Sequence, residues 1–231
     1  MSNILNLGLF INNSIYKHKF DFEVVKEKEV FVNIALYNLL YEQDLNNIDI
    51  EIFIENCSIF KGKATALYLE GNDNQVILKV DAKLDSGFLD NINLLSKGDN
   101  LTSSIPCNLN MKVKEDIILQ GNHLEKLETL KENLSLPYFA ILEDRINFVD
   151  FESEPKLTPN LMKVEVNTTE KNFKYIQMDS KFNGSLNVGD IFTYKDDTYA
   201  VESIIYTLNG NDFKQEIYGI NHALHKARYL K

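Results

Sequence analysis

The sequence predicts a mainly β (β+α) protein, and three features of the chain support this fold class. Short runs of β-branched and aromatic residues recur along most of its length, separated by turn residues such as Asn209-Gly210-Asn211-Asp212, the strongest hairpin signal. Residues 48–52 alternate between isoleucine and an acidic residue, as in a strand with one buried face. Residues 122–135 instead carry leucines at helical spacing.

The first part of the chain is expected to be rich in strands. Residues 30–41 are ambiguous, because Val30 and Ile34 fit a helical stripe whereas Phe31 and Val32 favour a strand. We expect a strand there, followed by a short helix. The other strands expected in this part cover residues 8–11, 15–25, 48–52, 58–69 and 76–80, with a loop or short helix over 85–104.

The middle of the chain predicts a helix followed by a hairpin. Asn122 is a suitable N-cap, and Glu125 stands three residues later in a capping-box relation. Pro137 blocks continuation of the helix. Two short strands, 138–142 and 146–151, are expected to follow.

The last part predicts further strands and a terminal helix. Gly189 is expected to take a positive φ in a tight turn before a strand. Residues 220–231 place Ile220, Leu224 and Leu230 at helical spacing, and we consider this apolar face a candidate docking site for a neighbouring subunit. The expected strands lie within 161–178, 191–194, 199–208 and 213–220.

A short internal sequence match links the two β-rich parts of the chain. The triplet Gly-Asn-Asp occurs at residues 71–73 and 210–212, and at the same offset Leu69 falls on Leu208 and Leu78 on Ile217. Such a match arises from duplication of a β unit or from chance, and both explanations stay open.

Composition bounds the class of protein. The 231 residues carry a net charge of −10, which disfavours binding to nucleic acid or to an anionic membrane surface. The chain start lacks a secretory signal, and no run of 18 apolar residues occurs. Cys57 and Cys107 are the only cysteines, so a reducing compartment is the default and one bridge between them stays possible. We expect a cytoplasmic protein without membrane insertion.

No residue pattern predicts catalysis. His222 and His225 have a spacing that suits one metal, but they lack further ligands nearby, so we interpret them as exposed residues at the end of a helix. His18, in an early strand, and His123, beside the N-cap, are expected to be structural. We therefore predict no catalytic, cofactor-binding or metal-binding residue, and no enzyme.

Two acidic pairs and the aromatic residues are the other candidates. Glu143-Asp144 and Asp196-Asp197 offer paired carboxylates, but both stand in expected turns, where acidic residues are common. The chain has 14 Phe and 11 Tyr but no Trp. In strands such rings favour a role in the core over a sugar-binding platform.

Three segments, in this order, resemble the phage tail hub family, which comprises the baseplate hub of contractile phages, the late-control D proteins and the trunk of type VI secretion spike proteins. The first resembles a barrel strand with an F-x-G motif, the second a helix followed by a hairpin, and the third a closing barrel. The segments are Phe60-Lys61-Gly62 with residues 63–67, residues 123–148, and Leu186 with Gly189, residues 199–204 and Phe213-Lys214-Gln215.

The resemblance implies two related small β-barrels, with a helix-plus-hairpin insertion between them and a short C-terminal helix. The implied division is a first barrel over residues 1–110, the insertion over 111–158, and a second barrel with the helix over 159–231. In this family two barrels per subunit let a homotrimer present a quasi-sixfold ring. The implied role is a structural adaptor between a sixfold tail tube and a threefold central spike.

The resemblance also implies partners and a location. The partners are a tail tube protein, a separate spike protein and other baseplate proteins, and the chain would end in a virion or tail-like particle after cytoplasmic assembly. The acidic charge suggests the hypothesis of a ring lumen that repels passing cargo. The alternative function is a monomeric β-rich carbohydrate-binding or adhesin module.

Overall fold

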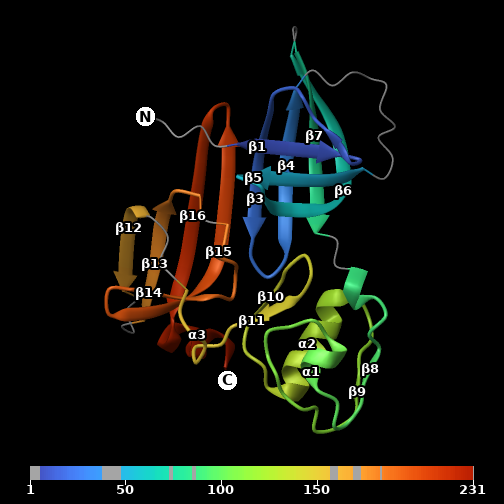
Figure 1. Cartoon of the computed structure of the whole chain (residues 1–231), viewed down its shortest axis with the longest axis vertical. Coiled ribbons are helices and arrows are strands. Elements are labelled where there is room, and N and C mark those ends of the chain that lie inside the picture. The colour runs from blue at the N-terminus through green and yellow to red at the C-terminus, as the bar shows by residue number, and fades with distance from the viewer. Residues whose placement is uncertain are drawn as a thin grey trace.

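The computed structural model of the chain describes residues 6–37, 48–72, 75–84, 87–156, 161–168, 173–182 and 184–230. Most of its strands belong to one 12-stranded sheet, in which every pair of neighbouring strands is antiparallel. Figure 1 shows that this sheet curls strongly in its N-terminal half and that a smaller, partly helical body lies below it. The short helix expected after the strand at residue 30 lies outside the described residues.

The N-terminal half of the sheet contains five strands that we call the first β unit. They occur in the spatial order β3-β4-β7-β6-β5, and β1 (Leu7–Ile11) and β2 (Ser14–Ile15) extend the sheet beyond β5. The five are β3 (Phe20–Lys26), β4 (Val30–Tyr37), β5 (Asp49–Ile54), β6 (Cys57–Asn72) and β7 (Gln75–Leu84).

The C-terminal half contains a second β unit with the same arrangement. Its spatial order is β12-β13-β16-β15-β14, so in both units the first, second, fifth, fourth and third strands of the sequence follow one another across the sheet. The strands are β12 (Leu161–Thr168), β13 (Lys174–Ser180), β14 (Ile191–Tyr194), β15 (Asp197–Asn209) and β16 (Asp212–Asn221). The predicted mainly β fold with two related units is confirmed.

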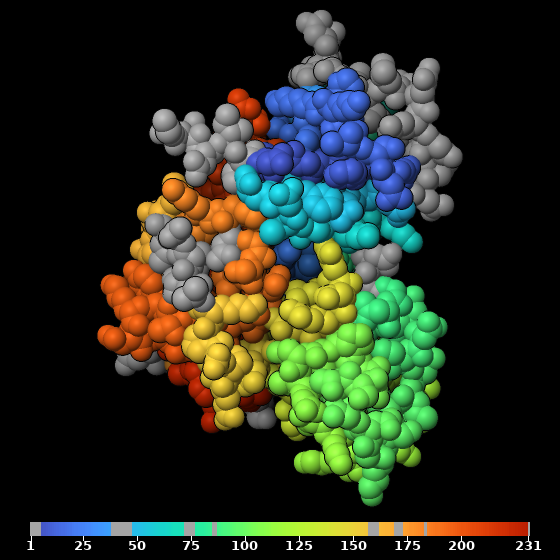
Figure 2. Space-filling view, viewed as in Figure 1, coloured from blue at the N-terminus to red at the C-terminus, as the bar shows by residue number. Residues whose placement is uncertain are grey.

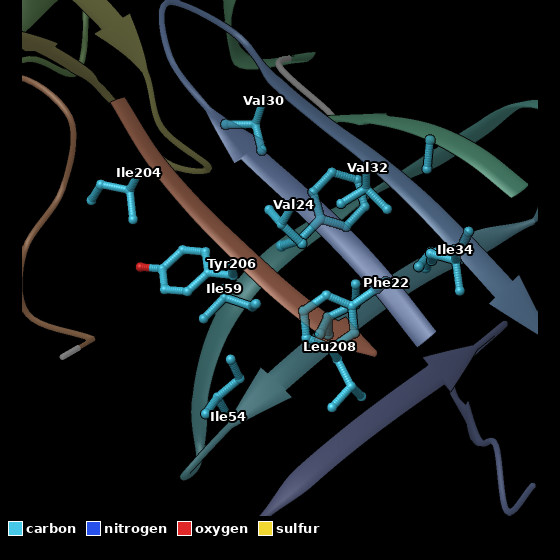
Figure 3. Packing of buried hydrophobic residues seen from close by; sticks show 14 of the residues in the cluster. Phe22, Val24, Val30, Val32, Ile34, Ile54, Ile59, Ile204, Tyr206 and Leu208 are labelled. Carbon is cyan, nitrogen blue, oxygen red and sulfur yellow. The ribbon is translucent and has the colours of Figure 1, made fainter. Parts of the chain in front are cut away.

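One strand pair joins the two units into a continuous sheet. Residues 204–208 of β15 pair with residues 22–26 of β3, and Tyr206 stands opposite Val24. Both side chains are almost fully buried. Figure 3 shows Tyr206, Leu208, Val24 and Phe22 packed in one hydrophobic core to which both units contribute.

The two long hairpins have their register shift and their closing turn at equivalent positions. The offset between these positions differs from the offset of the Gly-Asn-Asp match in the sequence. In β6–β7 a register shift falls between Ala64 and Ala66, and the hairpin closes at Asn72 and Gln75. In β15–β16 the shift falls between Val201 and Ser203, and the hairpin closes at Asn209 and Asp212. One alignment of the two segments without gaps superposes both features, and it places Gly71 on Leu208 instead of on Gly210. Gly71 and Gly210 therefore occupy different places in the two hairpins.

The body below the sheet lies between the two units in sequence and has a hydrophobic cluster of its own. This cluster runs from Leu89 to Phe148. Figures 1 and 2 show the body as a green and yellow mass beneath the curled sheet. Its elements are η1 (Gly87–Leu89), β8 (Leu94–Leu95), α1 (Leu101–Ser104), β9 (Ile117–Ile118), α2 (His123–Leu134), β10 (Phe139–Ile141) and β11 (Ile146–Phe148).

The helix and hairpin of this body follow the sequence prediction closely. Asn122 caps α2 by accepting a hydrogen bond from the Glu125 backbone, and the Glu125 side chain accepts one from the Asn122 backbone, so the capping box is present. Ser135 ends the helix in the left-handed conformation. Strand β10 then pairs with β11.

Buried polar contacts fix this hairpin to the second β unit. Asn147 of β11 is buried and donates hydrogen bonds from Nδ2 to the Val188 carbonyl oxygen at 2.7 Å and to Asp190 Oδ1 at 3.1 Å. Gly189, between these two partners, has φ +88° as predicted. The hairpin and the turn before β14 therefore hold each other in place.

The terminal helix α3 (His222–Tyr229) differs from expectation. Ile220 and Leu224 belong to the face predicted to dock on a neighbouring subunit, but both are buried within their own chain. The helix lies against β13, β15 and β16 and covers part of the second β unit. Ile220 and Leu224 are therefore not available to a neighbouring subunit, whereas Leu230, the third residue of the predicted face, is exposed.

Candidate assembly surface

Exposed apolar side chains gather at two edges of the large sheet. On β6, beyond its register shift, Tyr68 and Leu69 are exposed, and on β12 Met162 and Val166 are exposed. The other large apolar residues that are exposed in the described part of the chain are Ile15, Phe31, Leu94, Ile118, Tyr175 and Leu230. An apolar side chain beside an open strand edge is a typical feature of a protein interface.

Both edges offer backbone groups for pairing. Within the part of the chain that the structure describes, β12 pairs only with β13, and residues 67–72 of β6 pair only with β7. Before its register shift β6 also pairs with β5, and this pairing ends at Asp49 and Lys63, where β5 begins. Within the described residues, positions 67–72 of β6 therefore keep one unpaired edge.

The close packing of β6 against β7 depends on Gly62, which belongs to the F-x-G motif of the sequence. A Cβ added there would lie 2.0 Å from the Lys83 carbonyl oxygen of β7, so no larger residue fits without a shift of the backbone. Phe60, two residues earlier, is fully buried in the common core. The motif thus places a buried aromatic ring and a glycine in close contact with the β7 backbone two residues apart on β6.

Ion pairs flank the apolar residues on both edges. On β12, Lys163 Nζ lies 2.6 Å from Glu165 Oε1, and this contact lowers the pKa of Glu165 and raises the pKa of Lys163. On the first β unit, Lys79 Nζ lies 3.5 Å from Glu70 Oε2. Each edge therefore carries an acidic side chain whose charge is already compensated by a lysine.

The two histidines of the terminal helix lie in different environments. His222 is exposed and stacks on Phe151, with ring centroids 4.5 Å apart. His225 is only 1% exposed, contrary to our interpretation, and packs against Phe151 and Tyr229. Neither ring nitrogen of His225 finds a hydrogen-bond partner among the described residues, and burial lowers its pKa to about 4. His225 is therefore a neutral core residue.

The other two histidines have visible contacts. His123, at the start of α2, contacts the carboxylate of Asp90. His18 lies in the connection between β2 and β3, where its ring meets that of Tyr16 at 5.6 Å. Within the described residues no group of three or more His, Cys, Asp or Glu side chains is arranged to hold a metal ion.

The acidic pair Glu143-Asp144 lies in the predicted turn, between β10 and β11, and lines a cleft of 610 Å³. Burial raises the pKa of Glu143, and the nearby Lys26 opposes this rise. Burial in turn lowers the pKa of Lys26 to about 8. The Ser58 hydroxyl donates a hydrogen bond to Glu143 at 3.2 Å, so this carboxylate links the hairpin to the first β unit.

The second acidic pair and the cysteines have simple positions. Asp197 closes the turn between β14 and β15 and accepts a hydrogen bond from Lys174 Nζ at 2.7 Å. Cys57 is exposed and Cys107 half-buried, and both thiols are free, so the possible bridge between them is absent. No helix in the described part of the chain has the length and apolar character needed to span a bilayer.

No protein-family model and no curated protein matches the sequence. Solved structures do match its fold over nearly the whole chain. The tail protein from Neisseria meningitidis MC58 has a TM-score of 0.68 at 9% identity and covers 95% of this chain and 97% of its own. The 43 kDa tail protein of prophage MuSo2 from Shewanella oneidensis has a TM-score of 0.69 at 7% identity, with coverages of 97% and 98%.

This chain has the fold of phage tail proteins. A third match to the tail-protein fold is the E. coli protein c3393, described as a component of the type VI secretion system with structural similarity to the T4 tail proteins gp27 and gp5. Its TM-score is 0.62 at 9% identity, and the match covers 94% of this chain and 77% of that one. The resemblance predicted from short motifs is confirmed at the level of the fold.

Sequence reasoning missed the residues at the two open edges. Residues 64–70 are rich in apolar side chains and residues 162–168 alternate between apolar and polar ones, which predicts strands but does not tell which strand ends a sheet. Leu69 and Val166 are exposed on strands that have a paired neighbour on one side only within the described residues. Which side of a strand is paired depends on strands far away in the sequence.

Proposed function

We propose that this protein is a structural hub of a phage tail or of a phage-tail-like contractile injection machine. In this proposal three copies form a ring that joins a sixfold tail tube to a threefold central spike. The observation that carries the proposal is the repetition of one five-strand unit within the chain, with the same spatial order of strands in both copies. Three chains would then supply six similar units to a ring.

The fold comparisons support this role. The three matched proteins are named as tail proteins or as a component of a secretion system similar to tail proteins, and the similarity extends over at least 94% of this chain. An adaptor of this kind works through protein interfaces, and we propose that it has no catalytic, cofactor-binding or metal-binding residues and is not an enzyme.

The proposed partners are a second and third copy of the chain, a tail tube protein, a separate spike protein and other baseplate proteins. We propose assembly in the cytoplasm and incorporation into the particle, without direct binding to nucleic acid or insertion into a membrane. We also propose a division into residues 1–110, 111–158 and 159–231 as a first barrel, an insertion and a second barrel with its helix, in which residues 89–105 of the first part pack into the hydrophobic cluster of the insertion.

Co-expression with the tube and spike proteins encoded nearby tests the function. The expected product is a complex with three copies of this chain, three spike chains and one ring of six tube subunits, measured by native mass spectrometry. A chain that stays monomeric and binds neither partner would contradict the hub function. That result would favour a carbohydrate-binding or adhesin module, for which a glycan screen is the next measurement.

A further inference from the structure

The strand pair that joins the two β units is a template for a contact between subunits. Because the units share one strand order, β6 of the first unit corresponds to β15 of the second, and β12 of the second corresponds to β3 of the first. Strands β15 and β3 pair within the chain. Their counterparts β6 and β12 each have an open edge in the described part of the chain.

We propose that β12 of one copy of the chain pairs antiparallel with residues 67–71 of β6 in a second copy, in the register of the β3–β15 junction. The proposal builds on the ring described above and names the contact that closes it. The second copy is the occupant that fits, because the two edges are different surfaces of the same chain and together reproduce a pair that the chain already makes.

The repeat fixes the β6 side of this register. The alignment that superposes the register shifts and the closing turns of the two long hairpins places Asn72 on Asn209. Counted back along both strands from these turns, Leu69 occupies the place of Tyr206. Residues 67–71 of β6 therefore correspond to residues 204–208 of β15, which are the residues that pair with β3.

The β12 side follows through the neighbouring strands. In the first unit Val24 pairs with Val32, which pairs with Ala82 of β7. In the second unit Val166 pairs with Ile176, which pairs with Gly219 of β16. The hairpin alignment that places Asn72 on Asn209 also places Ala82 on Gly219. Val166 therefore occupies the place of Val24.

Leu69 of one copy would thus face Val166 of the next, as Tyr206 faces Val24 within the chain. Tyr206 and Val24 are 1% and 0% exposed, whereas Leu69 and Val166 are 57% and 43% exposed. Each of the two exposed residues stands two positions after a residue of the same strand whose side chain packs against the common core. The pairing would extend that core across the subunit boundary.

The same register places Glu70 opposite Glu165. These carboxylates already have lysine partners, Lys79 at 3.5 Å and Lys163 at 2.6 Å. The subunit contact would therefore bring together two compensated ion pairs rather than two bare negative charges. The hydrophobic pair and the backbone ladder carry the attraction, and the ion pairs lie beside them.

Disulfide trapping tests the register. In a background with Cys57→Ser and Cys107→Ser, the variant Leu69→Cys/Val166→Cys places two thiols directly across the proposed pair, within the Cα separation that a disulfide accepts. The chain is oxidised both alone and after co-expression with the tube and spike proteins. We expect covalent species of two and three chains in denaturing electrophoresis.

Two control variants separate this register from random collision. Tyr68→Cys/Val166→Cys moves one thiol to the opposite face of β6, and Ile15→Cys places an exposed thiol on β2, a strand that takes no part in the proposed pair. We expect at least tenfold less covalent product from each.

In a second experiment Leu69→Lys alone is expected to weaken self-association at least tenfold, and Leu69→Lys/Val166→Glu is expected to restore part of it.

The outcomes distinguish this inference from the proposed function. A trimer that binds tube and spike, but shows neither the Leu69–Val166 disulfide nor the charge rescue, overturns the register and leaves the hub function standing. A chain that stays monomeric in the presence of both partners overturns both. Since Leu69 and Val166 are exposed in the single chain, the variants are expected to unfold at the same temperature as the parent, which circular dichroism checks.

Discussion

The turn before β14 shows how single residues connect the parts of the molecule. Gly189 adopts φ +88°, and a Cβ there would lie 2.9 Å from the Asn147 backbone oxygen. The buried Asn147 side chain in turn bonds the residues on both sides of the glycine. The sequence predicted the positive φ of Gly189, but not its contact with a strand much earlier in the chain.

Gly189→Ala is expected to lower the free energy of unfolding by about 2–4 kcal/mol, because the left-handed backbone and the close contact both penalise a side chain. Gly98→Ala is a matched control, since Gly98 has φ +92° but nothing lies within 4 Å of its added Cβ. We expect a loss of only about 1 kcal/mol there. Urea denaturation measures both, and equal losses would contradict the role of the Asn147 contact.

His225 makes stability depend on pH. Its folded-state pKa of about 4 lies below its ordinary value of 6.5, because burial disfavours the charged ring and His222 adds a smaller effect in the same direction. The unfolded chain therefore binds the proton first as the pH falls. Stability from this residue is complete above pH 6.5 and is lost progressively down to about pH 4.

His225→Leu is expected to remove this dependence. Between pH 7.5 and 5.0 the parent should lose about 2 kcal/mol more unfolding free energy than the variant does. Near neutral pH the variant should be at least as stable as the parent, because leucine leaves no unpaired buried nitrogen. Urea titrations at the two pH values measure this, and parallel losses in both proteins would argue against a buried neutral imidazole.

At the scale of elements, the sequence predicted the features that depend on neighbouring residues. It did not predict which distant strands pair. The capping box of α2 and the hairpin at Asn209 depend on neighbouring residues and were predicted correctly. Strands β8 and β9 have only two residues each and give no periodic pattern. The β3–β15 junction links segments near opposite ends of the chain, so no local signal encodes it.

The close packing of β6 against β7 is an element-scale feature that a single substitution tests. Gly62→Ala should destabilise the fold by about 1–3 kcal/mol or more, because the added methyl group would clash with the backbone of β7. Gly8→Ala in β1 is the matched control, since its added Cβ makes only ordinary contacts at 3.8 Å. Thermal unfolding should show a clearly lower melting temperature for Gly62→Ala but not for Gly8→Ala. An unchanged melting temperature for Gly62→Ala would contradict the close packing of β6 against β7.

At the scale of the whole molecule, the repeated five-strand unit gives a physical reason for assembly. Each unit ends in a strand that needs a neighbour, and the chain satisfies one such pair internally through β3 and β15. The open edges of β6 and β12 carry the exposed Leu69 and Val166. A head-to-tail contact of this kind either closes into a ring or continues as a filament, and three chains with six units would close a ring.

The mass of the native protein in solution tests this account most directly. Light scattering should give about 80 kDa, three copies of the 26.6 kDa chain, with no tendency to grow as the concentration rises. The tube and spike proteins should add to this trimer without changing its copy number. A monomer that neither self-associates nor recruits the two partners would contradict the account.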